Sequence, residues 1–146
     1  MGAESMVHAL EQVHSLLKSG GFLIDIHPNG EPVEFIYPFE GREHLIGYMQ
    51  ESDDYIEYHQ ADEALDVAVS NGLFQVEKSE EFTFNTHAKK FDELKTFLDE
   101  NWSDAVVSEE VIANAKKLEW EYGQRAVHLR EKVRMTVFKA IRQPTR

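Results

Sequence analysis

Apolar residues recur every three or four positions near the start of the chain, which predicts a helix over Met6–Leu17. Gly20 and Gly21 end this helix, and the short continuous apolar run Phe22–Ile26 follows. A continuous run of this length predicts a strand that is buried on both faces, as in a parallel sheet. Pro28 has no N–H to donate, so the strand is expected to end there.

Two runs of residues that favour strands, Val33–Phe39 and Leu45–Met49, lie on either side of Gly41. This pattern predicts a β-hairpin with Gly41 in the turn. Pro38 and Gly47 interrupt the two runs, and both residue types weaken a regular ladder. We therefore expect irregular or edge strands here.

The middle of the chain predicts a short helix over Gln60–Asn71 and a strand over Leu73–Thr86. Within this strand, alternate apolar residues share one parity, which predicts one core face and one solvated face. The residues of the expected core face are Phe74, Val76, Phe82 and Phe84. The intervening Lys78 and Glu80 fall on the apolar parity, so we expect a bend there.

The last third predicts two more helices and a closing strand. Apolar spacing indicates a short helix over Phe91–Leu98. Ser108 is a good N-cap for a long helix that reaches Leu129 and bends at Gly123. Large and β-branched residues then predict a strand over Val133–Ile141.

The amino-acid composition excludes several classes of functional site and partner. The chain of 146 residues is expected to form a single domain, 1–146, and its 42% apolar residues can build a core. The absence of cysteine excludes disulfides, Cys-ligated metal sites and thiol catalysis, and it fits a cytoplasmic protein. A net charge of -12 argues against partners that are nucleic acids or anionic membranes. No apolar run reaches the ~20 residues of a membrane span.

The segment His8–Pro28, with the sequence HALEQVHSLLKSGGFLIDIHP, resembles the late part of class I S-adenosylmethionine-dependent methyltransferases. In that family a helix, a Gly-Gly pair and the fifth strand of a Rossmann-like sheet follow one another. The resemblance implies that Leu73–Thr86 is the sixth strand and Val133–Ile141 the antiparallel seventh strand, which lies between the other two. The expected fold is therefore α/β, a partial mixed sheet of this type flanked by helices, with the hairpin as an appendage near the strand ends.

The family's cofactor site lies in the half of the domain that precedes this segment. It uses a Gly-rich turn, and glycines of this kind allow the backbone to approach a ligand closely. No G-x-G occurs in this sequence, and Gly20–Gly21 terminates a helix before a strand. We therefore expect no cofactor-binding residue in this chain. S-adenosylmethionine would be bound only if a partner chain supplied the missing half.

Candidate catalytic residues are few. His27 is the best, because the carboxyl ends of strands line ligand crevices in open α/β sheets, and Asp25 lies one residue inside the same strand. Both also fit purely structural roles, a turn histidine and a hydrogen-bonded carboxylate. The seven histidines lack the spacing of a metal site, and no serine or threonine lies in a nucleophile-elbow pattern. We predict no metal.

Three functional hypotheses follow. The first is a methyltransferase-related module that has no catalysis of its own and acts by binding or assembly. The second is a split or truncated methyltransferase completed by another chain that carries the N-terminal half-domain. The third is an unrelated α+β protein that binds a small ligand.

The resemblance also predicts association between copies. In the complete family fold a fourth strand covers one edge of the fifth, whereas the segment before Phe22–Ile26 here is predicted to be helical. An unpaired apolar strand edge is a liability that proteins cover. We therefore expect a homodimer that uses the Phe22–Ile26 edge and the Met6–Leu17 helix.

Overall fold

The computed structural model describes residues 2–142, and these divide into two compact units. Unit 1 takes residues 2–30, 56–82 and 133–142, and unit 2 takes residues 31–55 and 83–132. The described residues form an α/β fold with four helices and six strands, and every strand pair for which a register is defined is antiparallel.

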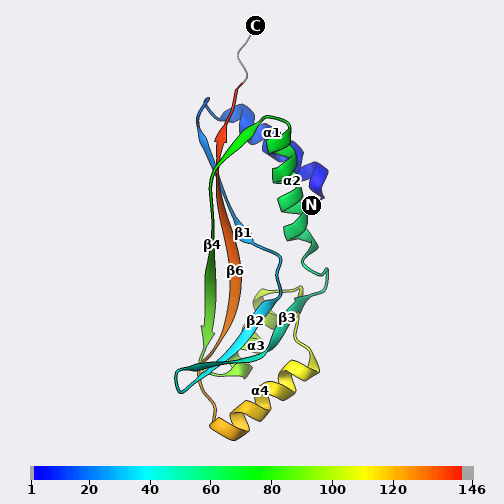
Figure 1. The fold of residues 1–146 in the computed structure, drawn as a ribbon. Coiled ribbons are helices and arrows are strands. Elements are labelled where there is room, and N and C mark those ends of the chain that lie inside the picture. The colour runs from blue at the N-terminus through cyan, green and yellow to red at the C-terminus, as the bar shows by residue number, and fades with distance from the viewer. Residues whose placement is uncertain (1, 143–146) are drawn as a thin grey trace. The chain divides into compact units, whose positions relative to one another are not determined.

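Unit 1 contains α1 (Ala3–Leu16), β1 (Phe22–Pro28) and α2 (Ile56–Ser70), together with parts of β4 (Phe74–Ala88) and β6 (Val127–Ala140). The last strand, β6, pairs with both β1 and β4 (Figure 1). It runs antiparallel to β1 in a register from Phe22↔Lys139 to Pro28↔Val133. The predicted position of the closing strand between the other two is thereby confirmed.

The direction of the strands corrects one expectation. Side-chain pairs along β4 and β6 join Ser79 to Thr136 and Glu81 to Arg134, so the two strands also run in opposite directions. β6 is thus antiparallel to both neighbours, and the described residues contain no parallel strand pair. The antiparallel orientation of the closing strand agrees with the prediction, but the sheet is antiparallel rather than mixed, because β1 and β4, which run in the same direction, are not neighbours.

The core of unit 1 lies between its sheet and its two helices, which cover one face of that sheet (Figure 1). Its buried residues are Ala68, Phe74, Phe138 and Ala140, and Leu10, Leu17, Leu23, Leu65, Val69 and Leu73 pack against them. The end of α1 is also fixed by Arg142, whose guanidinium donates to the carbonyl oxygens of His14, Ser15 and Leu17.

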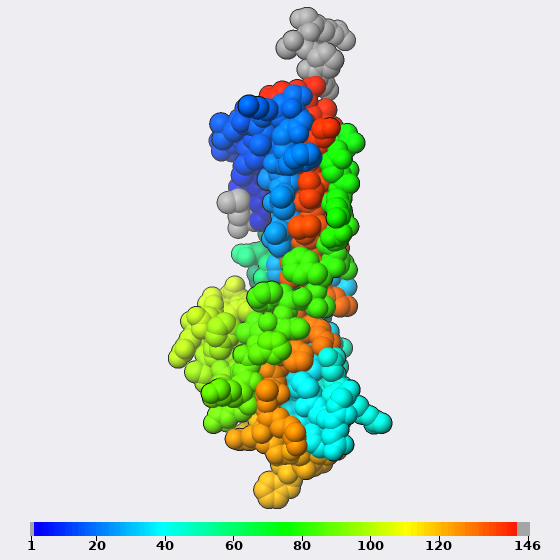
Figure 2. Space-filling view, turned by 90° about the vertical axis from the view of Figure 1, so that its left-hand side faces the viewer, coloured from blue at the N-terminus to red at the C-terminus, as the bar shows by residue number. Residues whose placement is uncertain are grey.

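The opposite face of β1 is open, which corrects the prediction that this strand is buried on both faces. Phe22, Ile24 and Ile26 are 58–59% exposed. Figure 2 shows β1, β6 and β4 at the surface of unit 1 with no helix over them. The run of apolar residues was compatible with cover on both faces, but the helices of unit 1 cover only one.

The prediction that one face of β4 is buried in the core is correct only for its first residue. Phe74 is buried, whereas Val76, Phe82 and Phe84 are 44–55% exposed. Alternation along a strand shows which residues share a face, but it does not show whether another element covers that face.

Unit 2 contains the hairpin of β2 (Val33–Phe39) and β3 (Arg42–Glu51), with Glu40 and Gly41 at positive φ in its turn. The predicted hairpin is confirmed. It is part of the sheet rather than an appendage, because β2 also pairs with β6 and β3 pairs with β5 (Ala105–Val106). β2 is accordingly not an edge strand, although its pairing with β3 shifts register between Phe35 and Ile36, as expected of an irregular strand.

Two helices complete unit 2, α3 (Phe91–Asn101) and α4 (Glu109–Tyr122). The hydroxyl of Ser108 accepts a hydrogen bond from the N–H of Val111, so this N-cap is confirmed. The long helix that was expected to bend at Gly123 is wrong. Gly123 has φ +93° and ends α4, because glycine adopts this backbone conformation at little cost, and β6 begins soon afterwards.

Candidate functional site

The strongest candidate site lies in unit 1 and is centred on His27. Its imidazole lies between two carboxylates, with Nδ1 at 2.5 Å from Oδ2 of Asp25 and Nε2 at 2.7 Å from Oδ1 of Asp62. The side chain of His27 is only 12% exposed. The structure thus brings together the two residues that the sequence singled out, and it adds a third from α2.

The local sequence explains this arrangement. Successive side chains of a strand point to opposite faces, so Asp25 and His27 share the face of β1 that the helices cover. Asp62 precedes Leu65 and Val69 by three and seven residues, which places it on the side of α2 that faces the sheet. The carboxylate therefore reaches the imidazole when the apolar face of α2 packs.

The two carboxylates favour the protonated form of His27. The hydrogen bond with Asp25 is the main cause that raises the pKa of His27 above its ordinary value, and Asp62 adds to the rise, while burial opposes it. An imidazole donates from both nitrogens only when it is protonated. The protonated ring can therefore donate to both carboxylates and connect β1 to α2.

Arg134 of β6 extends the charged network. One of its guanidinium nitrogens lies 3.7 Å from the same Asp62 oxygen, and another donates to Oε1 of Glu81 at 3.2 Å. Beside this pair, the hydroxyls of Ser79 and Thr136 lie 3.2 Å apart. Asp62 thus receives positive charge from both β1 and β6.

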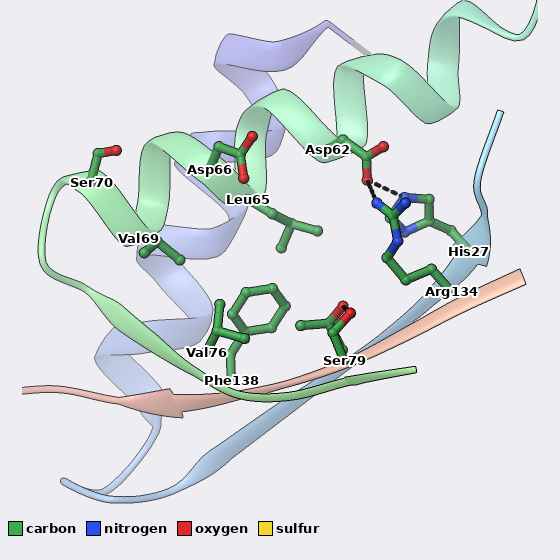
Figure 3. A pocket seen from close by; sticks show the side chains of 11 residues that line it. His27, Asp62, Leu65, Asp66, Val69, Ser70, Val76, Ser79, Arg134 and Phe138 are labelled. Carbon is green, nitrogen blue, oxygen red and sulfur yellow. Dashed lines mark hydrogen bonds and ion pairs between the residues drawn. The ribbon is translucent and has the colours of Figure 1, made fainter. Parts of the chain in front are cut away.

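The network forms one end of a cavity of about 550 Å³ in unit 1. In Figure 3, His27 and Arg134 reach Asp62 from the sheet, while Asp66 follows Asp62 along α2. The other end is lined by apolar side chains, namely Leu65, Val69, Val76 and Phe138. The cavity therefore suits a molecule with a polar head and an apolar body.

The arrangement limits the chemistry that His27 can perform. When both nitrogens donate to carboxylates, the ring has no free lone pair and can act as a general base only after it has lost a proton. Acidic side chains also outnumber basic ones around the ring. The imidazole and the two carboxylates form a structural ion-pair network in the cavity wall, and this geometry differs from that of a catalytic dyad.

A smaller cavity of about 220 Å³ lies between α1 and α2. Its walls are apolar, and Asp25 is its only charged lining residue among those described. Asp25 lines this smaller cavity while its carboxylate binds His27, which lines the larger one.

Asp62 and Arg134 were not identified from the sequence as site residues. Arg134 alternates with Thr136 and Phe138, a pattern that places all three on one face of β6. This alternation could have identified Arg134 as a candidate from the sequence. The pairing of His27 with Asp62 spans 35 residues and depends on how α2 packs, which no local pattern encodes.

Comparison with protein-family models, with curated proteins and with solved structures found no match. Among the described residues, no group of three or more histidine or acidic side chains is arranged to hold a metal ion. None of the helices in residues 2–142 has the length and apolar character needed to cross a membrane.

Proposed function

We propose that this chain is a methyltransferase-related module that has no S-adenosylmethionine site of its own and acts through binding or assembly. The observation that carries the proposal is the strand order of unit 1, in which β6 lies antiparallel between β1 and β4. The resemblance over His8–Pro28 implied this order for three separate segments of the chain. A strand that returns between two earlier ones requires long connections, so the order is not the simplest that such segments can form.

The glycines of the chain support the absence of a cofactor site. In the family the cofactor lies against a Gly-rich turn, and this sequence contains no G-x-G. Gly20 and Gly21 instead continue the pairing of β1 with β6. The N–H of Gly20 donates to the carbonyl of Ala140 at 3.0 Å, and the N–H of Ala140 donates to the carbonyl of Gly21 at 2.7 Å. Their backbone is used for structure and is not free to bind a ligand.

Isothermal titration calorimetry with S-adenosylmethionine tests this proposal. We expect no binding heat when the cofactor is titrated into the chain. Saturable binding in the micromolar range would contradict the proposal, because it would require a cofactor site within these 146 residues. Under the split-enzyme alternative, binding appears only after a second chain with the N-terminal half-domain is added.

The larger cavity favours a second candidate function, the binding of a small ligand. Asp66 lines the cavity and forms no ion pair or hydrogen bond within the described part of the chain. A free carboxylate next to an apolar wall suits an amine with an apolar body. Nuclear magnetic resonance titration with 2-phenylethylamine should shift the signals of Val69 and Phe138, whereas phenylacetate should not. Equal shifts with both compounds, or shifts that persist in Asp66→Asn, would exclude this function.

A further inference from the structure

β1 has one unpaired edge. It lies at the end of the strand order and pairs only with β6 among residues 2–142. An antiparallel ladder engages the N–H and C=O of alternate residues, so the remaining groups of β1 point away from β6. No backbone hydrogen bond from Phe22–His27 to any segment besides β6 is found in the described chain. This edge therefore presents free donors and acceptors.

The other edge strand of unit 1 is protected, and β1 is not. The part of β4 in unit 1 carries exposed charges in close succession, Glu77, Lys78, Glu80 and Glu81. Charged side chains on an edge oppose pairing with another chain. In β1 the only charged residues are Asp25 and His27, which bind each other on the helix-covered face.

Apolar side chains that are not buried accompany this free edge. Phe22, Ile24 and Ile26 alternate with less exposed residues and line the open face of β1. Leu16, at the end of α1, is 85% exposed. No residue of α1 is fully buried, although α1 carries an apolar stripe. Exposed apolar surface of this extent around a strand edge is typical of an interaction site.

We propose that a second copy of this chain pairs with the free edge of β1, with β1 antiparallel to its counterpart and a two-fold axis close to Ile24. This rests on the assembly role proposed above and names its partner. The axis places Phe22 opposite Ile26 of the partner subunit and Ile24 opposite its own copy, so the apolar stripe continues across the interface. Every strand pair with a defined register is antiparallel, and this arrangement extends the same ladder.

The charges around β1 favour self-association despite the net charge of -12. Lys18 and Lys139 lie beside the start of β1, since Lys139 is paired with Phe22. In the first half of α1, which carries Glu4, Met6 and Ala9 line a cavity with Asp25 at the middle of β1. An antiparallel partner therefore brings Lys18 and Lys139 of one copy toward the end of β1 in the other copy, where Asp62 and Glu81 accompany His27 and Arg134.

Cross-linking tests this geometry cleanly, because the chain contains no cysteine. Oxidation of Ile24→Cys should give a disulfide-linked dimer in high yield, since residues paired across an antiparallel ladder lie about 5 Å apart and disulfides span this distance. Val76→Cys is the matched control, because Val76 is 48% exposed on the charged edge strand β4. It should remain monomeric.

Equal cross-linking of the two variants, or none in Ile24→Cys, would overturn the proposal. Hydrogen exchange gives an independent measurement on the unmodified chain. The amides of β1 that point away from β6 should become more protected as the protein concentration rises, and those of β4 should not. Protection that is independent of concentration would also overturn it. None of these outcomes depends on S-adenosylmethionine, so the dimer and the absence of a cofactor site can fail separately.

Discussion

Nε2 of His27 lies 2.7 Å from Oδ1 of Asp62, although 35 residues separate the two in the sequence. The contact joins the end of β1 to α2, and on its other side the same imidazole binds Asp25. The imidazole of His27 thus connects β1 to α2 within unit 1. Its protonation state can be tested directly.

The ring of His27 should titrate above its ordinary pKa of 6.5, because both carboxylates stabilise the imidazolium. Nuclear magnetic resonance of the imidazole signals against pH gives the midpoint. Asp62→Asn should lower this midpoint, whereas Glu63→Gln, a change at the neighbouring exposed carboxylate, should leave it unchanged. A midpoint at or below the ordinary value in the parent chain would contradict the assignment.

The interaction of His27 with Asp25 and Asp62 makes the free energy of unfolding depend on pH. A pKa that is raised on folding adds stability below the unfolded value of about 6.5, and this stability is lost as pH rises through the folded value. The difference in free energy of unfolding between the parent chain and His27→Gln should therefore shrink as pH rises above neutrality. Urea unfolding at a series of pH values measures it, and a difference that grows with pH would show that His27 is neutral in the fold.

His128 of unit 2 should behave in the opposite way. Burial is the main cause that lowers the pKa of His128, and the neighbouring Arg130 and His87 act in the same direction. Its folded-state pKa thus lies below the ordinary 6.5, so the stability it contributes is present above that value and is lost as pH falls. The imidazole signals of His128 should titrate below those of His27 in the same spectra. If His27 and His128 titrated with the same midpoint, the opposite pKa shifts assigned to the two rings would be contradicted.

Position 47 requires a glycine, because its backbone lies close to the side chain of Val111. A Cβ at position 47 would lie 2.7 Å from Cγ2 of Val111, which is itself only 5% exposed. Gly47→Ala should therefore destabilise the chain by about 1–3 kcal/mol, as expected for overpacking. Adding Val111→Ala removes the clashing methyl group, so the double variant should be more stable than the sum of the two single effects predicts. Strict additivity in urea unfolding would show that this contact is not the cause.

The sequence predicts the elements better than it predicts what covers them. Ser108 and Gly41 mark a helix start and a hairpin turn through local backbone chemistry, and both appear where expected. The exposure of Ile24 and Phe82 depends on where distant helices pack, and the apolar pattern alone gave the wrong answer. Gly123 shows a local ambiguity, since a glycine in an apolar repeat fits either a bend or a stop.

The same distinction between local pattern and long-range packing applies to the candidate site. His27 and Asp25 share one face of one strand, so their proximity follows from alternation along β1. Asp62 and Arg134 come from elements that lie far from β1 in the sequence and meet it only in the packed unit. Long-range pairing of this kind requires the tertiary structure.

Sedimentation equilibrium tests the central claim, that this chain assembles through the free edge of β1. The parent protein should have twice the 16.9 kDa mass of one chain at high micromolar concentration. Ile24→Lys should give 16.9 kDa with an unchanged circular dichroism spectrum, because the position is 58% exposed and accepts a lysine in the single chain. A parent protein that sediments as a single chain, or a folded Ile24→Lys variant that remains dimeric, would contradict the account.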